Sequence, residues 1–358
     1  MALRTFTPSG GKIFDSTDPC FGVCIGIVKA QAAPQSVSYP ALAGSTIKAL
    51  SCNGRSVTSA VSYPGGIPTV TLPAYTFSSA AAPLVVSVWA STKQAVSPGP
   101  GITAVNEGGG SLALSPQGFG LYYESTLATN GTYVSGAIEA DGFRPLDAWH
   151  FQYPWGFSGS QLDRVFVLEL EENISSRMDI EPWGVVVRSR YSNTGNPYPP
   201  KVHMFRRAAA PVGPPFFNMK TDAGELTWDL MRVGMLKAAG EGTNTPTLPQ
   251  LKQVAGVSHI GVIGAMPADK SVPRTEQVPT GNRIIEYEDG VPYDRGSEMK
   301  DITTCYGEVH YLSATGPLTG GAYVYGLQSN RRTYRGDPGN SAAYSRNFFF
   351  VNLDFLYP

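Results

Sequence analysis

The sequence predicts an all-β protein, built mainly from antiparallel β-sandwich or barrel-like domains with long Gly/Pro-rich loops and little helix. Charged residues make up only 15% of the chain, against an average of about 25%. Glycine and proline contribute 40 and 29 residues, which is typical of short strands joined by tight turns. A hydrophobic fraction of 42% favours folded cores over disorder.

Composition divides the 358 residues into three regions. Residues 1–118 are rich in small residues and are interpreted as an N-terminal β domain. Residues 119–210 form an aromatic-rich β region that ends in a proline-rich linker, expected over 192–215. Residues 211–358 are interpreted as a C-terminal β domain.

Apolar or alternating runs bounded by turn residues predict the individual strands. After an N-terminal hairpin, the first region is expected to contain strands at 20–28, 45–51, 56–62, 69–77 and 84–90. The second region is expected to contain strands at 165–171 and 183–191, and the third at 259–265, 308–314, 322–328 and 346–355. The last strand is apolar on both faces at 348–351, so its own domain or a neighbouring subunit must cover it.

The start of the chain is similar to a later segment. Residues 3–15 and 217–229 each contain a strand-like run, a Thr-x-x-Gly turn, a charged residue, an apolar residue, and an aromatic residue followed by Asp. The second copy has one extra residue before its aromatic. Both segments are predicted to be β-hairpins, and both an internal repeat and a chance match fit them. A helix is the alternative for the second copy, with a cap at Thr221 or Asp222 and apolar residues at Leu226, Leu230, Val233 and Leu236.

Charge and hydropathy exclude some classes of protein. The net charge is −1 and no basic stripe could follow a phosphate backbone, so no nucleic-acid partner is expected. No run reaches the roughly 18 apolar residues of a membrane span, and Met1–Phe6 lacks the apolar core of a signal peptide. We therefore expect no membrane span and assembly in the cytoplasm of the producing cell. The cysteines are expected to be buried thiols: Cys20, Cys24, Cys52 and Cys305.

Motifs for catalysis or cofactor binding are weak. The four histidines follow no metal-ligand spacing, and Cys20 and Cys24 lack a second pair of zinc ligands. Residues 156–159 and 336–341 match the surroundings of a nucleophilic serine only in part. We therefore expect no catalytic residue, no cofactor and no metal.

Two carboxylate sets leave alternatives open. A glycosidase pair could come from Asp163, Glu169, Glu171, Glu172, Asp179 and Glu181. Calcium could be ligated within 286–294 by Glu286, Glu288, Asp289 and Asp294, although Asp289-Gly290 is also a strong turn signal.

The best candidate interaction surface is an aromatic segment at 149–155. Alternation would place four rings on one face of a strand: Trp149, Phe151, Tyr153 and Trp155. Aromatic rings stack on sugars and dominate protein interfaces, so this face would suit a glycan or a protein partner. The same alternation also fits rings packed in a core.

Residues 10–16 read Gly-Gly-Lys-Ile-Phe-Asp-Ser, after a short apolar run and before the expected strand at 20–28. This opening resembles the start of small tail-associated proteins of tailed bacteriophages. Residues 224–229 are similar to the same segment, with Leu230 in place of the serine. The resemblance implies a β-rich, oligomeric virion protein of the tail tip, baseplate or fibre, and it brings no catalytic residues.

Together these observations predict a structural component of a phage virion that mediates tail assembly and, as a second role, host-surface attachment. Its expected partners are other virion tail proteins, further copies of the chain, and a host-surface glycan or protein receptor. The alternatives are a capsid decoration or head–tail connector protein and a glycan-active hydrolase of the tail-spike kind. No β-helix period supports the hydrolase.

Overall fold

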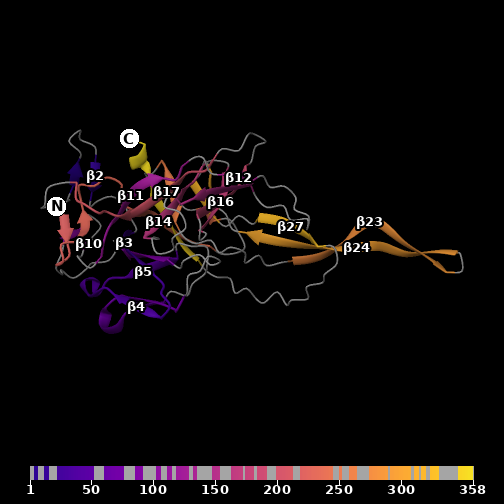
Figure 1. Cartoon of the computed structure of the whole chain (residues 1–358), viewed down its shortest axis with the longest axis horizontal. Coiled ribbons are helices and arrows are strands. Elements are labelled where there is room, and N and C mark those ends of the chain that lie inside the picture. Colours follow the sequence, from indigo (N-terminus) through magenta and orange to yellow (C-terminus); the bar gives the residue numbers. More distant parts are fainter. Residues whose placement is uncertain are drawn as a thin grey trace.

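The computed structural model is that of an all-β protein, as the sequence predicts (Figure 1). It describes residues 4–6, 12–15, 22–51, 60–75, 85–91, 102–105, 111–114, 118–128, 132–134, 147–153, 163–171, 174–180, 184–191, 199–212, 218–244, 250–251, 258–263, 274–288, 291–307, 310–313, 316–319, 323–329 and 346–357. Within these ranges the helical elements are short 3-10 turns: η1 (Pro40–Leu42), η2 (Pro64–Gly66) and η5 (Asp354–Leu356).

The largest sheet has nine strands, each antiparallel to its neighbours. In spatial order they are β11 (Leu121–Thr126), β17 (Val202–Arg207), β14 (Arg164–Glu169), β22 (Ile260–Ile263), β28 (Arg346–Asn352), β20 (Lys237–Asn244), β3 (Gly22–Lys29), β8 (Val85–Ser91) and β5 (Ile47–Ser51). Each of the three predicted regions contributes three of these strands, so all three regions build one sheet.

A seven-stranded antiparallel sheet faces the large sheet. Its strands, in spatial order, are β12 (Thr132–Val134), β13 (Asp147–Gln152), β16 (Gly184–Tyr191), β15 (Ile174–Ile180), β25 (His310–Ser313), β26 (Gly316–Thr319) and β21 (Gln250–Leu251). The two sheets share one hydrophobic core, in which the rings of Tyr153 and Phe166 stack with centroids 5.6 Å apart.

The opposite face of the large sheet buries a second core. Successive residues of a strand point to opposite faces, so Cys24 and Trp89 enter the first core while Val23, Ile25 and Val88 enter the second. Two small units contribute to the second core: the sheet of β4 (Gln35–Ser38), β7 (Thr69–Leu72) and β6 (Ala60–Ser62), and the hairpin of β18 (Asn218–Lys220) and β19 (Leu226–Asp229). A further hairpin joins β9 (Ile102–Val105) and β10 (Ser111–Leu114).

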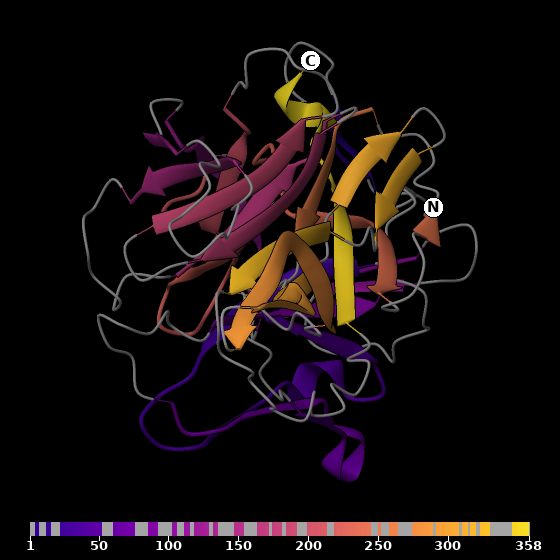
Figure 2. The same cartoon turned by 90° about the vertical axis from the view of Figure 1, so that its right-hand side faces the viewer.

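A three-stranded sheet projects from this body as a long arm, which points toward the viewer in Figure 2 (Figures 1 and 2). It consists of β23 (Arg274–Glu288), β24 (Val291–Gly307) and β27 (Tyr323–Ser329). β27 pairs with β24 over residues 301–307, whereas residues 291–300 of β24 pair with β23 alone among the described residues. Glu288 pairs with Val291, so residues 289–290, which lie outside the described ranges, make the connection. The sequence did not predict these two long strands.

The two hairpins that resemble each other in sequence also share one register. The first hairpin joins β1 (Arg4–Phe6) and β2 (Lys12–Asp15). Its backbone pairs are Arg4–Asp15, Thr5–Phe14 and Phe6–Lys12, and those of the second are Asn218–Asp229, Met219–Trp228 and Lys220–Leu226. Each residue number in the second hairpin exceeds that of its counterpart in the first by 214, as for Arg4 and Asn218. The register also shifts at the same step, between Thr5 and Phe6 in the first hairpin and between Met219 and Lys220 in the second. The extra residue expected in the second copy is therefore wrong: the two segments align without a gap.

The strands that follow the two hairpins lie side by side in the large sheet. β3 and β20 pair antiparallel through Val23 and Lys237, and the Cys24 N–H donates to the Leu236 carbonyl at 3.4 Å. The offset of 214 maps Val23 onto Lys237, so an approximate two-fold axis passes through this pair. The register shifts of β3 against β8 and of β20 against β28 obey the same offset, at Cys24/Gly26 and Ala238/Gly240.

The equivalence continues into the next two strands on each side. Ile47 of β5 pairs with Ala90 of β8, and Ile260 of β22 pairs with Asn352 of β28 at the corresponding step. Module 1 is therefore β1, β2, β3, β5 and β8, and module 2 is β18, β19, β20, β22 and β28. Their six sheet strands run β5-β8-β3 and then β20-β28-β22, as a two-fold axis requires. The segment between β5 and β8 contains β6 and β7, whereas the segment between β22 and β28 contains the arm.

Two predictions about local structure are wrong. Residues 226–229 form a buried strand, not the alternative helix, because positive φ angles at Gly224 and Gly234 (81° each) break the helical path. The predicted linker over 192–215 contains β17, a strand between β11 and β14. Pro199 and Pro200 before it and Pro211 after it bound the strand without interrupting its ladder.

The apolar end of the chain is covered by its own sheet. Phe349, Phe350 and Val351 lie in β28 between β20 and β22 and are at most 2% exposed. Burial on both faces explains why this segment shows no alternation.

Candidate functional site

The predicted aromatic surface lies inside the protein. Trp149, Phe151 and Tyr153 are 8%, 2% and 4% exposed and belong to the core between the two large sheets. The predicted alternation is correct, because Gln152 between two of them is exposed. The prediction that these three rings form an interaction surface is wrong, because the rings pack in the hydrophobic core. Trp155 lies outside the described residues.

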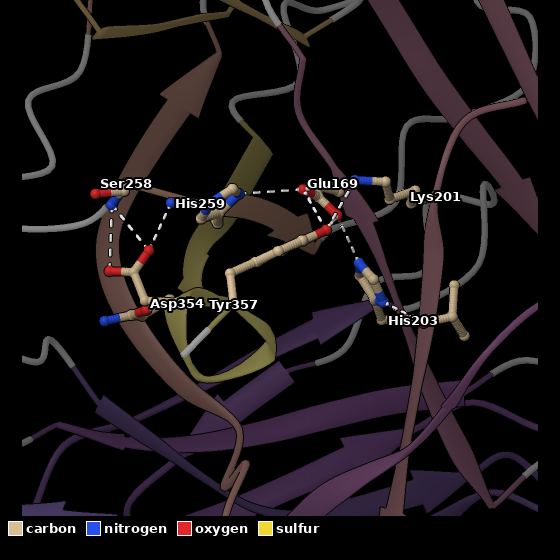
Figure 3. Close-up of polar contacts among 9 residues, drawn as sticks. Glu169, Lys201, His203, Ser258, His259, Asp354 and Tyr357 are labelled. Atoms are coloured by element: carbon tan, nitrogen blue, oxygen red, sulfur yellow. Dashed lines mark hydrogen bonds and ion pairs between the residues drawn. The ribbon is translucent and has the colours of Figure 1, made fainter. Parts of the chain in front are cut away.

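The most densely connected polar cluster centres on Glu169 at the end of β14 (Figure 3). The residue is 5% exposed. Its Oε2 lies 2.9 Å from Nε2 of His203 on β17 and accepts a hydrogen bond from the Tyr357 hydroxyl at 2.7 Å. Its Oε1 lies 3.5 Å from Nζ of Lys201 and 3.4 Å from Nδ1 of His259. One buried carboxylate therefore connects β14, β17, the residue before β22 and the C-terminal segment.

The C-terminal segment is held on this cluster by two residues (Figure 3). The Tyr357 ring stacks on His259 with centroids 3.7 Å apart, and its hydroxyl lies 2.8 Å from Nζ of Lys201. The Asp354 carboxylate accepts hydrogen bonds from the backbone N–H groups of Ser258 and His259. These contacts fasten η5 to the start of β22.

The cluster keeps Glu169 ionised. Burial alone would raise the pKa of Glu169, but hydrogen bonds from His203 and Tyr357 and the charge of Lys201 outweigh it and lower the pKa to about 2. Burial would lower the pKa of Lys201, yet its bond to Tyr357 and the nearby carboxylate raise it. Glu169 and Lys201 thus hold each other in their charged forms.

A hydroxyl–imidazole–carboxylate chain runs through the cluster. Thr126 Oγ1 lies 2.9 Å from Nδ1 of His203, whose Nε2 contacts Glu169. Nucleophilic catalysis uses such a chain when the base can reach a substrate. Here His203 is 2% exposed and both carboxylate oxygens are occupied. A glycosidase acid also needs a raised pKa, which is the reverse of the shift at Glu169. The geometry therefore fits a structural lock between segments.

A second candidate site is a groove where β17 ends, which we call the arginine groove. It consists of two adjoining cavities of about 450 and 310 Å³ that share residues 206–210. Its charged lining residues are Arg206, Arg207, Lys220 and Arg232 with Glu124, Asp163 and Glu225. These side chains come from β11, β17, the β18–β19 hairpin and the flanking turns.

The arginines of this groove differ in exposure and in the hydrogen bonds that they already make within the chain. Arg207 donates to the Leu226 carbonyl at 2.7 Å, and Arg232 donates to the Ala210 carbonyl at 2.6 Å. Arg206 is 41% exposed and lies 3.2 Å from Glu124, which already accepts two hydrogen bonds from Arg164. Arg206 is therefore the cation best placed to meet an anion from outside.

The other sequence candidates are spread over the fold. Cys24 is a buried thiol that contacts the Gly26 carbonyl, Cys305 lies in β24, and Cys20 and Cys52 fall outside the described residues. So do both serine segments, 156–159 and 336–341, and the acids Glu172 and Glu181. The calcium candidates Glu286, Glu288 and Asp294 lie on paired strands of the arm. Within the described ranges, no three His, Cys, Asp or Glu side chains are grouped as a metal site.

Sequence reasoning included Glu169 only in a list of acids. Its partners are 32 to 188 residues away in sequence, from 201 minus 169 to 357 minus 169, and they meet only because β14, β17 and β22 are neighbours. An acidic residue at the end of an otherwise apolar strand, Arg164–Glu169, was the one available signal.

Searches against protein-family models, curated proteins and solved structures found no match to this chain. In the part of the chain that the structure describes, no helix has the length and apolar character to cross a membrane.

Proposed function

We propose that this chain is a structural component of a phage virion at the tail tip, baseplate or fibre, and that it joins its neighbours through the β23–β24 arm. The arm is the observation that carries this proposal. Its neighbours would be other tail proteins and further copies of the chain. The proposal assigns the chain no catalytic step, and it places synthesis in the host cytoplasm.

A long two-stranded ribbon needs a partner. β23 has 15 residues, a length that spans about 50 Å in an extended strand. Isolated two-stranded hairpins are marginally stable in water, and their outer edges present unpaired N–H and C=O groups. Along residues 291–300 of β24, β23 is the one paired neighbour among the described residues. Packing against another subunit would cover the ribbon and stabilise it.

Host-surface attachment is the second role in this proposal. The buried rings of Trp149, Phe151 and Tyr153 cannot supply it. The end of the arm is the better candidate, because Val291 at the start of β24 is 52% exposed. A glycan or protein receptor would meet the molecule at an arm end that no neighbouring subunit covers.

Cryo-electron microscopy of the particle that carries the chain tests the proposal. Density for the chain in symmetric copies on the tail, with the arm against a neighbour, is the expected result. Density on the head would replace the tail assignment with the decoration or connector alternative. Absence of the chain from purified particles would overturn the structural role.

A further inference from the structure

The end of the arm and the arginine groove carry complementary charges. Residues 286–294 contain four carboxylates and no basic residue: Glu286, Glu288, Asp289 and Asp294. We propose that this acidic tip of one copy docks into the arginine groove of a second copy, so that the chain assembles head to tail. The inference rests on the proposed assembly function and specifies which surfaces meet.

The groove offers cations at its opening. Arg206 is 41% exposed, and Lys220 at the end of β18 is exposed beside it in the larger cavity. Glu124 and Asp163, two of the three lining acids, are both held by Arg164. The Nε of Arg232 is buried, has no hydrogen-bond partner among the described residues, and lies 3.9 Å from the Asp229 carboxylate. An arriving carboxylate would therefore meet basic groups whose acidic neighbours are already neutralised.

The tip also has the composition of a contact surface. Tyr287 and Tyr293 belong to the same sequence segment as the exposed Val291. Tyrosine is enriched at protein interfaces, where it combines apolar area with a hydroxyl group. Apolar contact would supply affinity, while the carboxylates would select the basic groove over other surfaces.

The tip cannot reach the groove of its own chain. The arm extends away from the body, and its tip lies at the opposite end of the molecule from β11 and β17, which line the groove (Figure 1). A contact between these two surfaces must therefore join different copies. Because the surfaces differ, the contact is heterologous, and repeating it gives a closed ring or an open filament.

Charge reversal on each surface tests the inference in the full-length chain. The groove variant is R206E/K220E, and the tip variant is E286K/E288K. We expect each variant alone to self-associate at least about tenfold more weakly than wild type in sedimentation velocity, a change of about 1.4 kcal/mol. We expect the two variants mixed in equal amounts to assemble again, because the two lysines introduced in one tip meet the two glutamates introduced in the other copy's groove, and the native tip meets the native groove. The control variant V212A changes an exposed residue outside both sets and should assemble as wild type.

The outcomes separate this inference from the proposed function. If the groove variant assembles as wild type while the tip variant does not, the arm binds elsewhere, and the groove serves another anion such as an acidic glycan. If each variant is monomeric and their mixture is monomeric too, charge pairing between these surfaces is wrong. In both cases the arm keeps its role in assembly, because the tip variant still fails to self-associate.

Carbodiimide cross-linking supplies an independent readout. The reagent joins a lysine to a contacting carboxylate, so a mixture of light and heavy isotope-labelled chains should yield a mixed peptide that joins Lys220 to a carboxylate within 286–294. A Lys220 cross-link to the tip found only within one isotope type would contradict docking between copies.

Discussion

Modules 1 and 2 share strand order, register and register shifts. They differ in the segment of chain that lies between β5 and β8 in module 1 and between β22 and β28 in module 2. In module 1 this segment contains β6 and β7, and β7 packs into the second core through Val70 and Leu72. In module 2 the corresponding segment contains the projecting arm (Figure 1), together with β25 and β26, which join the seven-stranded sheet. The difference indicates that the equivalent strands form a common scaffold and that the two modules differ in the segment inserted into it.

The modules also differ at their outer strands. In module 2, the sheet continues beyond β22 to β14, which pairs with it through Leu168–Val262 and Glu169–Gly261. In module 1, β5 is the last strand of the described sheet. Glu169 therefore stands where module 2 is extended and where the C-terminal segment is fastened. Among the described residues, no strand lies beyond β5 to hold a counterpart of this lock in module 1.

The largest predicted effect tests whether the module 2 hairpin supports the scaffold. Trp228 of β19 is 0% exposed and packs against the backbone at Gly118 and Gly120. Trp228→Ala should lower the free energy of unfolding by about 4 kcal/mol, because it removes a large buried ring and leaves a cavity. Urea denaturation measures this loss. A loss below about 1 kcal/mol would mean that the hairpin is not part of the cooperative core.

The next largest effect is expected at Glu169, the centre of the lock that distinguishes module 2. Glu169→Gln should cost about 3 kcal/mol at neutral pH, because the folded state lowers the pKa of this carboxyl from 4.5 to about 2. Because the folded state lowers this pKa, the Glu169 carboxylate contributes its full stabilisation above pH 4.5. That stabilisation is lost as the pH falls through 2. The difference between wild type and variant should therefore shrink in acid. Asp163→Asn, at an exposed carboxylate, is the control and should change stability by less than about 0.5 kcal/mol. An unchanged difference between pH 7 and pH 3 would contradict the lock.

A smaller effect compares two glycines of module 2. Gly234 and Gly224 both have φ near 81°, but an added Cβ at Gly234 would lie 2.7 Å from Phe355, whereas at Gly224 it would meet nothing within 4 Å. Gly224→Ala should cost about 1 kcal/mol, and Gly234→Ala about 1 kcal/mol more. Thermal unfolding of both variants gives the ranking, and the reverse order would contradict the packing at Phe355. The counterpart of Gly234 in module 1 is Cys20, which lies outside the described residues.

The smallest effect concerns a glycine that both modules share. Gly26 follows the register shift of β3, and its counterpart is Gly240. A Cβ at Gly26 would lie 3.4 Å from the Phe119 ring, which is ordinary contact. Gly26→Ala should therefore change stability by less than about 1 kcal/mol in the same thermal assay. A larger loss would show that the shift itself requires glycine.

The sequence was sufficient for the parts of the fold with strong local patterns. β3, β5, β8 and β16 were predicted within about two residues, because apolar runs between turn residues identify strands locally. β17 was missed because prolines surround it, and β23 and β24 because their residues are mostly polar and charged. Neither the two-fold relation nor the Glu169 cluster could be predicted, since both depend on which strands become neighbours in the sheet.

Sedimentation velocity of a shortened-arm variant tests directly whether the arm mediates assembly. Val278 pairs with Lys300, so residues 279–299 can be replaced by Asn-Gly, which closes a two-residue turn at that pair and preserves the pairing of β24 with β27. We expect the wild-type chain to self-associate, while the shortened chain stays monomeric and unfolds at the same temperature. Equal self-association of the two proteins would contradict the assignment of assembly to the arm.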